Sequence, residues 1–175
     1  MSLNLLKKYP QLLELNYLSE KQRKESLMRI FKRDIEDNVN FSFRKKQIKP
    51  VKKDGQTPMQ VLFHHLTTRE DKDENGNATK SRSFEMARSQ RLHWVRHHTE
   101  NNIPVGVEIF SYTDRIDRKD VIRTYIYDMK QEYVIILEPY RSGLDYYLIT
   151  AYHVNEPGGK KQILKKKGQK LPEVY

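Results

Sequence analysis

The chain has 175 residues, of which 32% are charged and 37% are hydrophobic, and its formal net charge at pH 7 is +10. This length fits one domain with an appendage and argues against two full domains. The absence of cysteine excludes disulfides, thiolate zinc sites and cysteine nucleophiles. No stretch approaches the roughly 18 apolar residues that cross a bilayer, and the first residues lack a secretory pattern, so we expect a cytoplasmic protein without a membrane partner.

The positive charge is concentrated towards the two ends of the chain. Residues 1–60 carry 14 Lys and Arg against 7 Asp and Glu, and six lysines without an acid lie between Gly158 and Lys170. Because each cation placed on a phosphate releases condensed counterions, this excess favours a polyanionic partner over a surface that is basic only for solubility. The residues expected to contact a nucleic-acid backbone are Lys45, Lys46, Lys52, Lys53, Lys160, Lys161, Lys165, Lys166 and Lys167.

The first 37 residues have the apolar spacing of helices, and residues 4–37 predict two of them. Ser19 is the expected N-cap of the second helix, which should run to about Asn38. The segment "FSFRKKQIKPVKKDGQTP" then indicates an irregular connection or an edge strand. The apolar positions that carry the helical pattern are Leu12, Leu13, Leu15 and Leu18, followed by Leu27, Ile30, Phe31 and Ile35.

The middle of the chain predicts a hairpin and then a helix. "MQVLFHHLTTRE" is rich in β-branched and aromatic residues, which favours a strand, and "DENGNATKSR" holds the turn signals that bring the chain back beside it. Residues 84–100 then show helical spacing, with Ser83 as the cap and with Asn101, Asn102 and Pro104 at the end.

The last third predicts four antiparallel strands, "VGVEIFSY", "VIRTYIYD", "YVIILEPY" and "DYYLITAYHV", joined by short turns. We therefore expect an α+β fold in which N-terminal helices precede a helix packed on a four-stranded antiparallel meander sheet. The expected divisions are a helical, basic N-terminal extension (1–60), an α+β domain (61–157) and a lysine-rich C-terminal tail (158–175), either mobile or helical on a polyanion.

Arginine, threonine and tyrosine side chains can gather on one face of the predicted sheet. Thr150 and Tyr152 share a face of the last strand, Arg123 lies on the second strand, and Arg141 follows the third. Guanidinium groups suit the phosphate in RNA cleavage by the 2'-hydroxyl, and His93 on the preceding helix suits proton transfer near neutral pH. This set predicts a ribonuclease site without a metal or cofactor.

A helix with a histidine, followed by an antiparallel meander whose last strand contains "TAY", resembles the phage and toxin ribonucleases grouped with barnase, EndoU, the tRNA-cutting colicins and RelE. The likeness covers roughly residues 83–154. It implies His93 as general base or acid, Tyr152 as second proton carrier, Arg123 and Arg141 as phosphate clamps, and Thr150 as an orienting hydroxyl. It also implies a single-stranded or tRNA-like RNA substrate. The sequence leaves open whether an immunity or antitoxin protein exists.

Two features depart from that family. Many members have proline or lysine where this chain has His153, and residues 1–60 have no counterpart that we can place.

Two other functions stay open. A metal-dependent nuclease would use Asp128 and Lys130 with Asp114 or Asp117 as a further ligand. A non-catalytic nucleic-acid-binding module would use the same basic segments together with aromatic stacking platforms, namely Trp94, Tyr112, Tyr125 and Tyr127.

Overall fold

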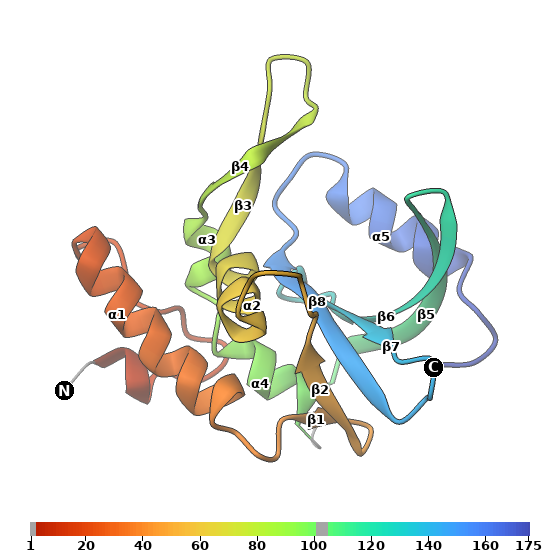
Figure 1. Ribbon diagram of the computed structural model, residues 1–175, viewed down its shortest axis with the longest axis horizontal. Coiled ribbons are helices and arrows are strands. Elements are labelled where there is room, and N and C mark those ends of the chain that lie inside the picture. Colours follow the sequence, from red (N-terminus) through yellow and green to blue (C-terminus); the bar gives the residue numbers. More distant parts are fainter. Residues whose placement is uncertain (1–2, 101–104) are drawn as a thin grey trace.

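The computed structural model describes residues 3–100 and 105–175, and it has an α+β fold (Figure 1). Its main element is a six-stranded sheet with the order β1-β2-β8-β7-β6-β5. The four strands expected from the last third of the sequence are β5 to β8, and neighbours among them pair antiparallel. The strands are β1 (Ser42–Phe43), β2 (Lys46–Pro50), β5 (Val107–Ile116), β6 (Lys119–Asp128), β7 (Tyr133–Pro139) and β8 (Asp145–His153).

The sheet is wider than the sequence predicts because the basic segment before residue 51 joins it. β2 pairs parallel with β8, from Gln47 opposite Asp145 to Pro50 opposite Leu148. Ile48 is the buried residue of this strand, so one apolar side chain anchors an otherwise polar segment. Proline has no amide hydrogen to donate to the ladder, which fits the end of the pairing at Pro50.

Both faces of the sheet are covered, so the central strand β7 is buried on both sides. Val134 and Ile136 belong to one apolar cluster and Ile135 and Leu137 to the other, and none of the four is more than 7% exposed. This double coverage explains why the sequence of β7 is a continuous apolar run. One face packs on the N-terminal helices, and the other packs on the C-terminal helix α5 (Gly159–Gly168) through Ile163.

One α-helix, not two, lies within residues 4–37. A 3-10 turn, η1 (Leu3–Leu6), opens the described chain, and α1 (Glu20–Phe31) continues into the π-helical turn η2 (Lys32–Glu36). Leu13 and Leu15 are buried from a non-helical segment, as alternate residues of an extended chain can be.

The N-cap prediction is confirmed at the start of α1. The Ser19 hydroxyl accepts from the Gln22 amide, and the Gln22 side chain accepts from the Ser19 amide, which completes a capping box. We expect Ser19→Ala to lower the free energy of unfolding by about 1 kcal/mol, because the Gln22 amide loses the hydroxyl that accepts its hydrogen bond. Ser19→Asp should retain most of the stability of the wild type, because an aspartate side chain can also accept from the Gln22 amide. Urea midpoints measure the effect, and equal midpoints for wild type and Ser19→Ala would show that the box contributes nothing.

The strand predicted at "MQVLFHHLTTRE" is wrong for most of its length, because Pro58–Thr67 forms helix α2. Pro58 suits the first helical turn, and Leu62, Phe63 and Leu66 bury one helical face. The hairpin around "DENGNATKSR" does form, from β3 (Thr68–Lys72) and β4 (Ala78–Phe84), as a separate two-stranded sheet that projects from the body of the molecule (Figure 1).

The helix predicted over residues 84–100 is two short helices, α3 (Met86–Ser89) and α4 (Trp94–Thr99). Between them the amides of Arg91 and Leu92 bond three residues back, to Arg88 and Ser89, as in a tight turn. This turn lets Leu92, Trp94 and Val95 all be buried. The predicted end at residues 101, 102 and 104 lies outside the described residues.

The two terminal segments are integrated with the middle of the chain. Residues from 13 to 48 share one core cluster with residues up to Ala151, so the segment before residue 60 is not packed as a separate extension. The lysine-rich segment forms α5, which packs on the sheet through Ile163. No helix in the described part of the chain has the length and apolarity needed to span a bilayer.

Candidate active site

A cleft of about 390 Å³ opens where the second half of β8 meets the β3–β4 hairpin, α3 and the start of α5. We call it the Arg88 cleft. Since β2 ends opposite Leu148, the later residues of β8 have no strand on that side, and α2 and α3 lie against β8 instead. The polar side chains that concern us in its lining are His65, Arg69, Lys72, Arg82, Glu85, Arg88, Thr150, Tyr152, His153 and Glu156.

Arg88 is the central cation of the cleft. Its Nη1 donates to the His65 carbonyl at 2.7 Å and lies 3.5 Å from the Thr150 hydroxyl, and its Cζ lies 5.4 Å from the centre of the Tyr152 ring. Its Nε is buried without a hydrogen bond. Burial, and then the charge of Arg82, lower the pKa of Arg88. A half-buried guanidinium is costly unless an anion meets it, so this arrangement is suited to receive one.

Arg82 brings a second cation to the cleft from β4. Its Nε and Nη2 donate to the hydroxyl and carbonyl oxygens of Thr68, at 2.9 and 3.0 Å, which fixes the plane of the guanidinium. Within the described residues neither Arg82 nor Arg88 forms an ion pair, whereas Arg69 and Lys72 of the same cleft both pair with Glu156, at 2.7 and 3.3 Å. Two guanidinium groups are therefore left to bind an anion.

Three groups in the cleft carry protons suited to acid-base chemistry. Burial, and then Arg82, lower the pKa of His65, so this imidazole is neutral at pH 7. Burial and Arg91 also lower the pKa of His153, whose Nδ1 donates to the Glu132 carbonyl at 3.1 Å, which leaves Nε2 as an acceptor. Burial raises the pKa of Tyr152, so its phenol keeps its proton.

The structure places two of the five sequence-predicted catalytic residues in this cleft, Thr150 and Tyr152. Arg123 lies on the α5-facing side of β6 with its Nε 3.6 Å from a carboxylate oxygen of Glu138 on β7, and Arg141 is exposed in the turn after β7. His93 is 5% exposed at the start of α4 and lines a different cavity. The predicted convergence of all five on one phosphate is therefore not what the fold provides.

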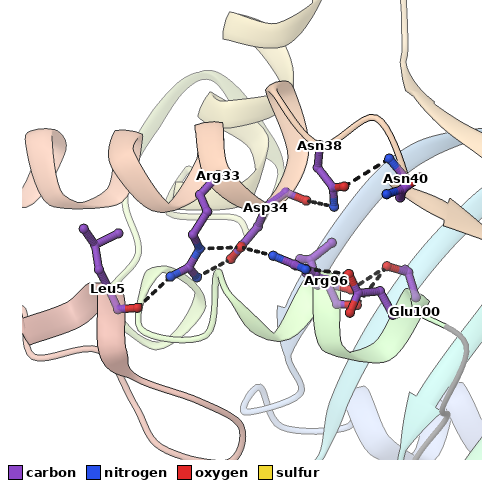
Figure 2. A network of polar contacts seen from close by, with 9 residues as sticks. Leu5, Arg33, Asp34, Asn38, Asn40, Arg96 and Glu100 are labelled. Carbon is purple, nitrogen blue, oxygen red and sulfur yellow. Dashed lines mark hydrogen bonds and ion pairs between the residues drawn. The ribbon is translucent and has the colours of Figure 1, made fainter.

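The surroundings of His93 also differ in charge from the Arg88 cleft. The nearby cations are already neutralised in the network that Figure 2 shows, where Arg33 and Arg96 both contact the buried Asp34 and Arg96 also pairs with Glu100. Arg33 additionally donates to the Leu5 carbonyl, which ties the N-terminal turn η1 to η2. Burial lowers the pKa of His93 to about 4. These contacts join η2, α4 and the N-terminal turn, which is a structural role.

Sequence reasoning missed Arg82, Arg88 and His65. Arg88 gave a signal, since it occupies an apolar position in the helical spacing of residues 84–95, where an arginine must be either solvated at the edge of the core or functional. His65 gave none, because its segment was assigned to a strand instead of to the last turn of α2.

Most of the lysines predicted to bind nucleic acid lie away from the cleft. Lys45 is in the turn between β1 and β2, and Lys46 is the first residue of β2 and lies over the Tyr146 ring. In α5 three lysines pair with sheet or turn carboxylates, and Lys52, Lys161 and Lys165 are exposed without an ion pair in the described structure. Lys53 alone of the nine lines a cavity next to the Arg88 cleft. The three α5 pairs are Lys160 with Glu132, Lys166 with Asp114 and Lys167 with Glu108.

The carboxylates of the metal-dependent alternative do not come together. Asp128 accepts from His98 and Tyr9 in the core, whereas Asp114 accepts from Lys166 and the Tyr125 hydroxyl beneath α5. Among the described residues no group of three or more His, Asp or Glu side chains has the arrangement of a metal site.

Comparisons of the chain with protein-family models, with curated proteins and with solved structures find no match. The function is therefore argued from the chain's own residues.

Proposed function

We propose that this protein is a metal-independent ribonuclease, of the phage or toxin type that its "TAY" strand resembles, and that the scissile phosphate binds in the Arg88 cleft. One observation carries the proposal: the guanidinium groups of Arg82 and Arg88, which form no ion pair within the described residues, share a cleft with His65 and Tyr152. Planar guanidinium groups match phosphate oxygens, and imidazole and phenol side chains supply proton transfer. The net charge of +10 favours the approach of a polyanion.

In the proposed reaction the RNA 2'-oxygen attacks the adjacent phosphorus while the bond from phosphorus to the 5'-oxygen breaks. The neutral His65 accepts the 2'-hydroxyl proton, and the Tyr152 phenol gives its proton to the leaving 5'-oxygen, which as an alkoxide is the stronger base. Arg82 and Arg88 stabilise the charge on the nonbridging oxygens. The products are a 2',3'-cyclic phosphate and a 5'-hydroxyl. His153 Nε2 is a second candidate acceptor of the 2'-hydroxyl proton in the cleft. The activities of His65→Ala and His153→Ala show which histidine has this role.

The test is cleavage of a labelled single-stranded RNA in EDTA, with the ends analysed for cyclic phosphate. We expect cleavage in EDTA, and we expect a strand with 2'-deoxyribose at the cleaved position to be resistant there. Cutting of the deoxy strand, or loss of cleavage in EDTA, would support the metal-dependent nuclease instead. Binding without cleavage would support the non-catalytic module.

The role of His65 predicts a pH dependence. A general base works only when neutral, so activity falls as the pH drops through its pKa, and the lowered pKa puts that acidic limb of kcat/KM below pH 6.5. We expect His65→Ala to lower kcat by roughly a hundredfold to ten-thousandfold and to remove the limb. Activity that survives in His65→Ala but disappears in His153→Ala would move the role to His153. Disappearance only in His93→Ala would reinstate the residue suggested by the sequence.

A further inference from the structure

A second cavity, of about 580 Å³, opens beside the Arg88 cleft, between the loop that precedes α2 and strand β4 of the hairpin. We call it the Lys53 chamber. The two cavities share Arg82 and His65 in their linings. They therefore lie side by side, and the Arg82 guanidinium, which is anchored on Thr68, lies between them. We refer to the two cavities together as the groove.

The Lys53 chamber is positively charged without compensation. Lys53, Lys80 and Arg82 line it, and no aspartate or glutamate does. None of these three cations forms an ion pair in the described part of the chain. The positive potential acts on both histidines of the chamber, because Arg82 contributes to lowering the pKa of His64 and both Arg82 and Lys53 contribute to lowering that of His65. The Arg88 cleft differs, since Glu156 neutralises two of its cations there.

The covalent repeat of a polynucleotide fits this row of cations. A strand carries one phosphate per nucleotide, so a chain whose scissile phosphate lies at Arg88 must carry a further phosphate past Arg82 or away from the cleft. Cavities of 390 and 580 Å³ have the size of small-ligand pockets, which admit separate nucleotides of a single strand but not a stacked duplex.

We propose that the Lys53 chamber is a subsite for the nucleotide that flanks the cleaved bond, with Lys53 and Lys80 on its phosphate, and that single-stranded RNA is the substrate class. The inference rests on the proposed function for the position of the scissile phosphate. It predicts that affinity increases from a mononucleotide to a short strand through these two lysines.

The experiment measures binding without cleavage. The full chain is titrated with a labelled single-stranded hexanucleotide whose 2'-oxygens are all methylated, so that none can attack, over a series of salt concentrations. We expect K53Q/K80Q to reduce the slope of log Kobs against log salt by about 1.4, since each phosphate contact on a single strand accounts for about 0.7. Binding at 0.1 M salt should weaken about tenfold or more. Binding of a 3'-phosphorylated mononucleotide, which occupies the Arg88 cleft alone, should not change.

A matched control removes two charges elsewhere. Lys21 on α1 and Lys119 on β6 are exposed and have no ion pair in the described structure, so K21Q/K119Q should bind the hexanucleotide like the wild type. Equal slopes for wild type and K53Q/K80Q would overturn the subsite, as would an equal loss in both double variants. A duplex RNA that displaces the labelled hexanucleotide as strongly as an unlabelled single strand does would also overturn it. If the binding pattern is found but unmodified RNA is not cleaved, the ribonuclease proposal fails while the groove stands.

Discussion

Arg88→Ala is expected to lower kcat for RNA cleavage by about a hundredfold to a thousandfold, the usual effect of removing one charge-stabilising donor from an active site. Its guanidinium contacts both Thr150 and Tyr152, and its buried Nε has no hydrogen-bond partner among the described residues. Arg88→Lys should restore little, because an ammonium cannot supply the planar pair of donors.

The stability of Arg88→Ala separates a functional arginine from a structural one. The variant removes a half-buried charge without an ion pair, a hydrogen bond to the His65 carbonyl and a long one to the Thr150 hydroxyl, so its free energy of unfolding should fall by no more than about 1 kcal/mol, or rise. Initial cleavage rates and urea midpoints test the two expectations together. Arg115→Ala, which removes an exposed arginine paired only with Asp120, serves as the matched control. Full activity in Arg88→Ala, together with loss of activity in Arg123→Ala or Arg141→Ala, would instead support Arg123 and Arg141 as the phosphate-binding residues, as the sequence suggested.

Asp128→Ala is expected to lower the free energy of unfolding by about 3–5 kcal/mol, the effect of removing one partner of a buried, hydrogen-bonded pair. Asp128 and His98 are 2% and 1% exposed in their side chains, and His98 Nε2 lies 2.9 Å from the carboxylate. The Tyr9 hydroxyl donates to the same oxygen at 2.7 Å, and the Gln131 amide donates to the other at 3.0 Å. Alanine would leave the buried His98 donor and the partly buried donors of Tyr9 and Gln131 without this acceptor.

The same carboxylate predicts acid sensitivity. Burial acts to raise the pKa of Asp128, but the hydrogen bonds from His98, Tyr9 and Gln131 outweigh it, so the pKa lies below its ordinary 3.8. The unfolded chain then binds the proton more readily, so this stabilisation is present above that value and is lost as the pH falls through the folded pKa. Urea midpoints between pH 2 and 7 measure it. Asp120→Ala, at a fully solvated ion pair, should change stability by less than about 0.5 kcal/mol, and a loss below 1 kcal/mol in Asp128→Ala would contradict the buried-pair account.

Local patterns predicted those parts of the fold that depend on local interactions. The Ser19 cap, the β3–β4 turn and the four strands from β5 to β8 each depend on residues near in sequence, and all are present. Alternation alone put Thr150 and Tyr152 on one face of β8, and both line the cleft.

The remaining errors concern contacts between distant segments. The pairing of β2 with β8 joins residues about a hundred apart in sequence. No local pattern in the basic segment that contains β2 predicts a parallel pairing partner. His93 was preferred because a continuous helix would carry it towards the sheet face. The turn at residues 90–93 instead buries it among α4, η2 and the N-terminal turn. The sequence shows Arg88 as part of a helical pattern. It lies beside Thr150 because β2 ends at Pro50 and leaves that edge of β8 open.

The parallel pairing of β2 with β8 also sets the order in which parts of the chain can fold during synthesis. During translation, the segment from 46 to 50 must wait for residues 145 to 148 before it can acquire its neighbour, and the cleft takes its last wall from Glu156 and the beginning of α5. Such distant closure makes folding slow and late. A nascent chain that has not yet reached Glu156 therefore lacks part of the wall of the Arg88 cleft.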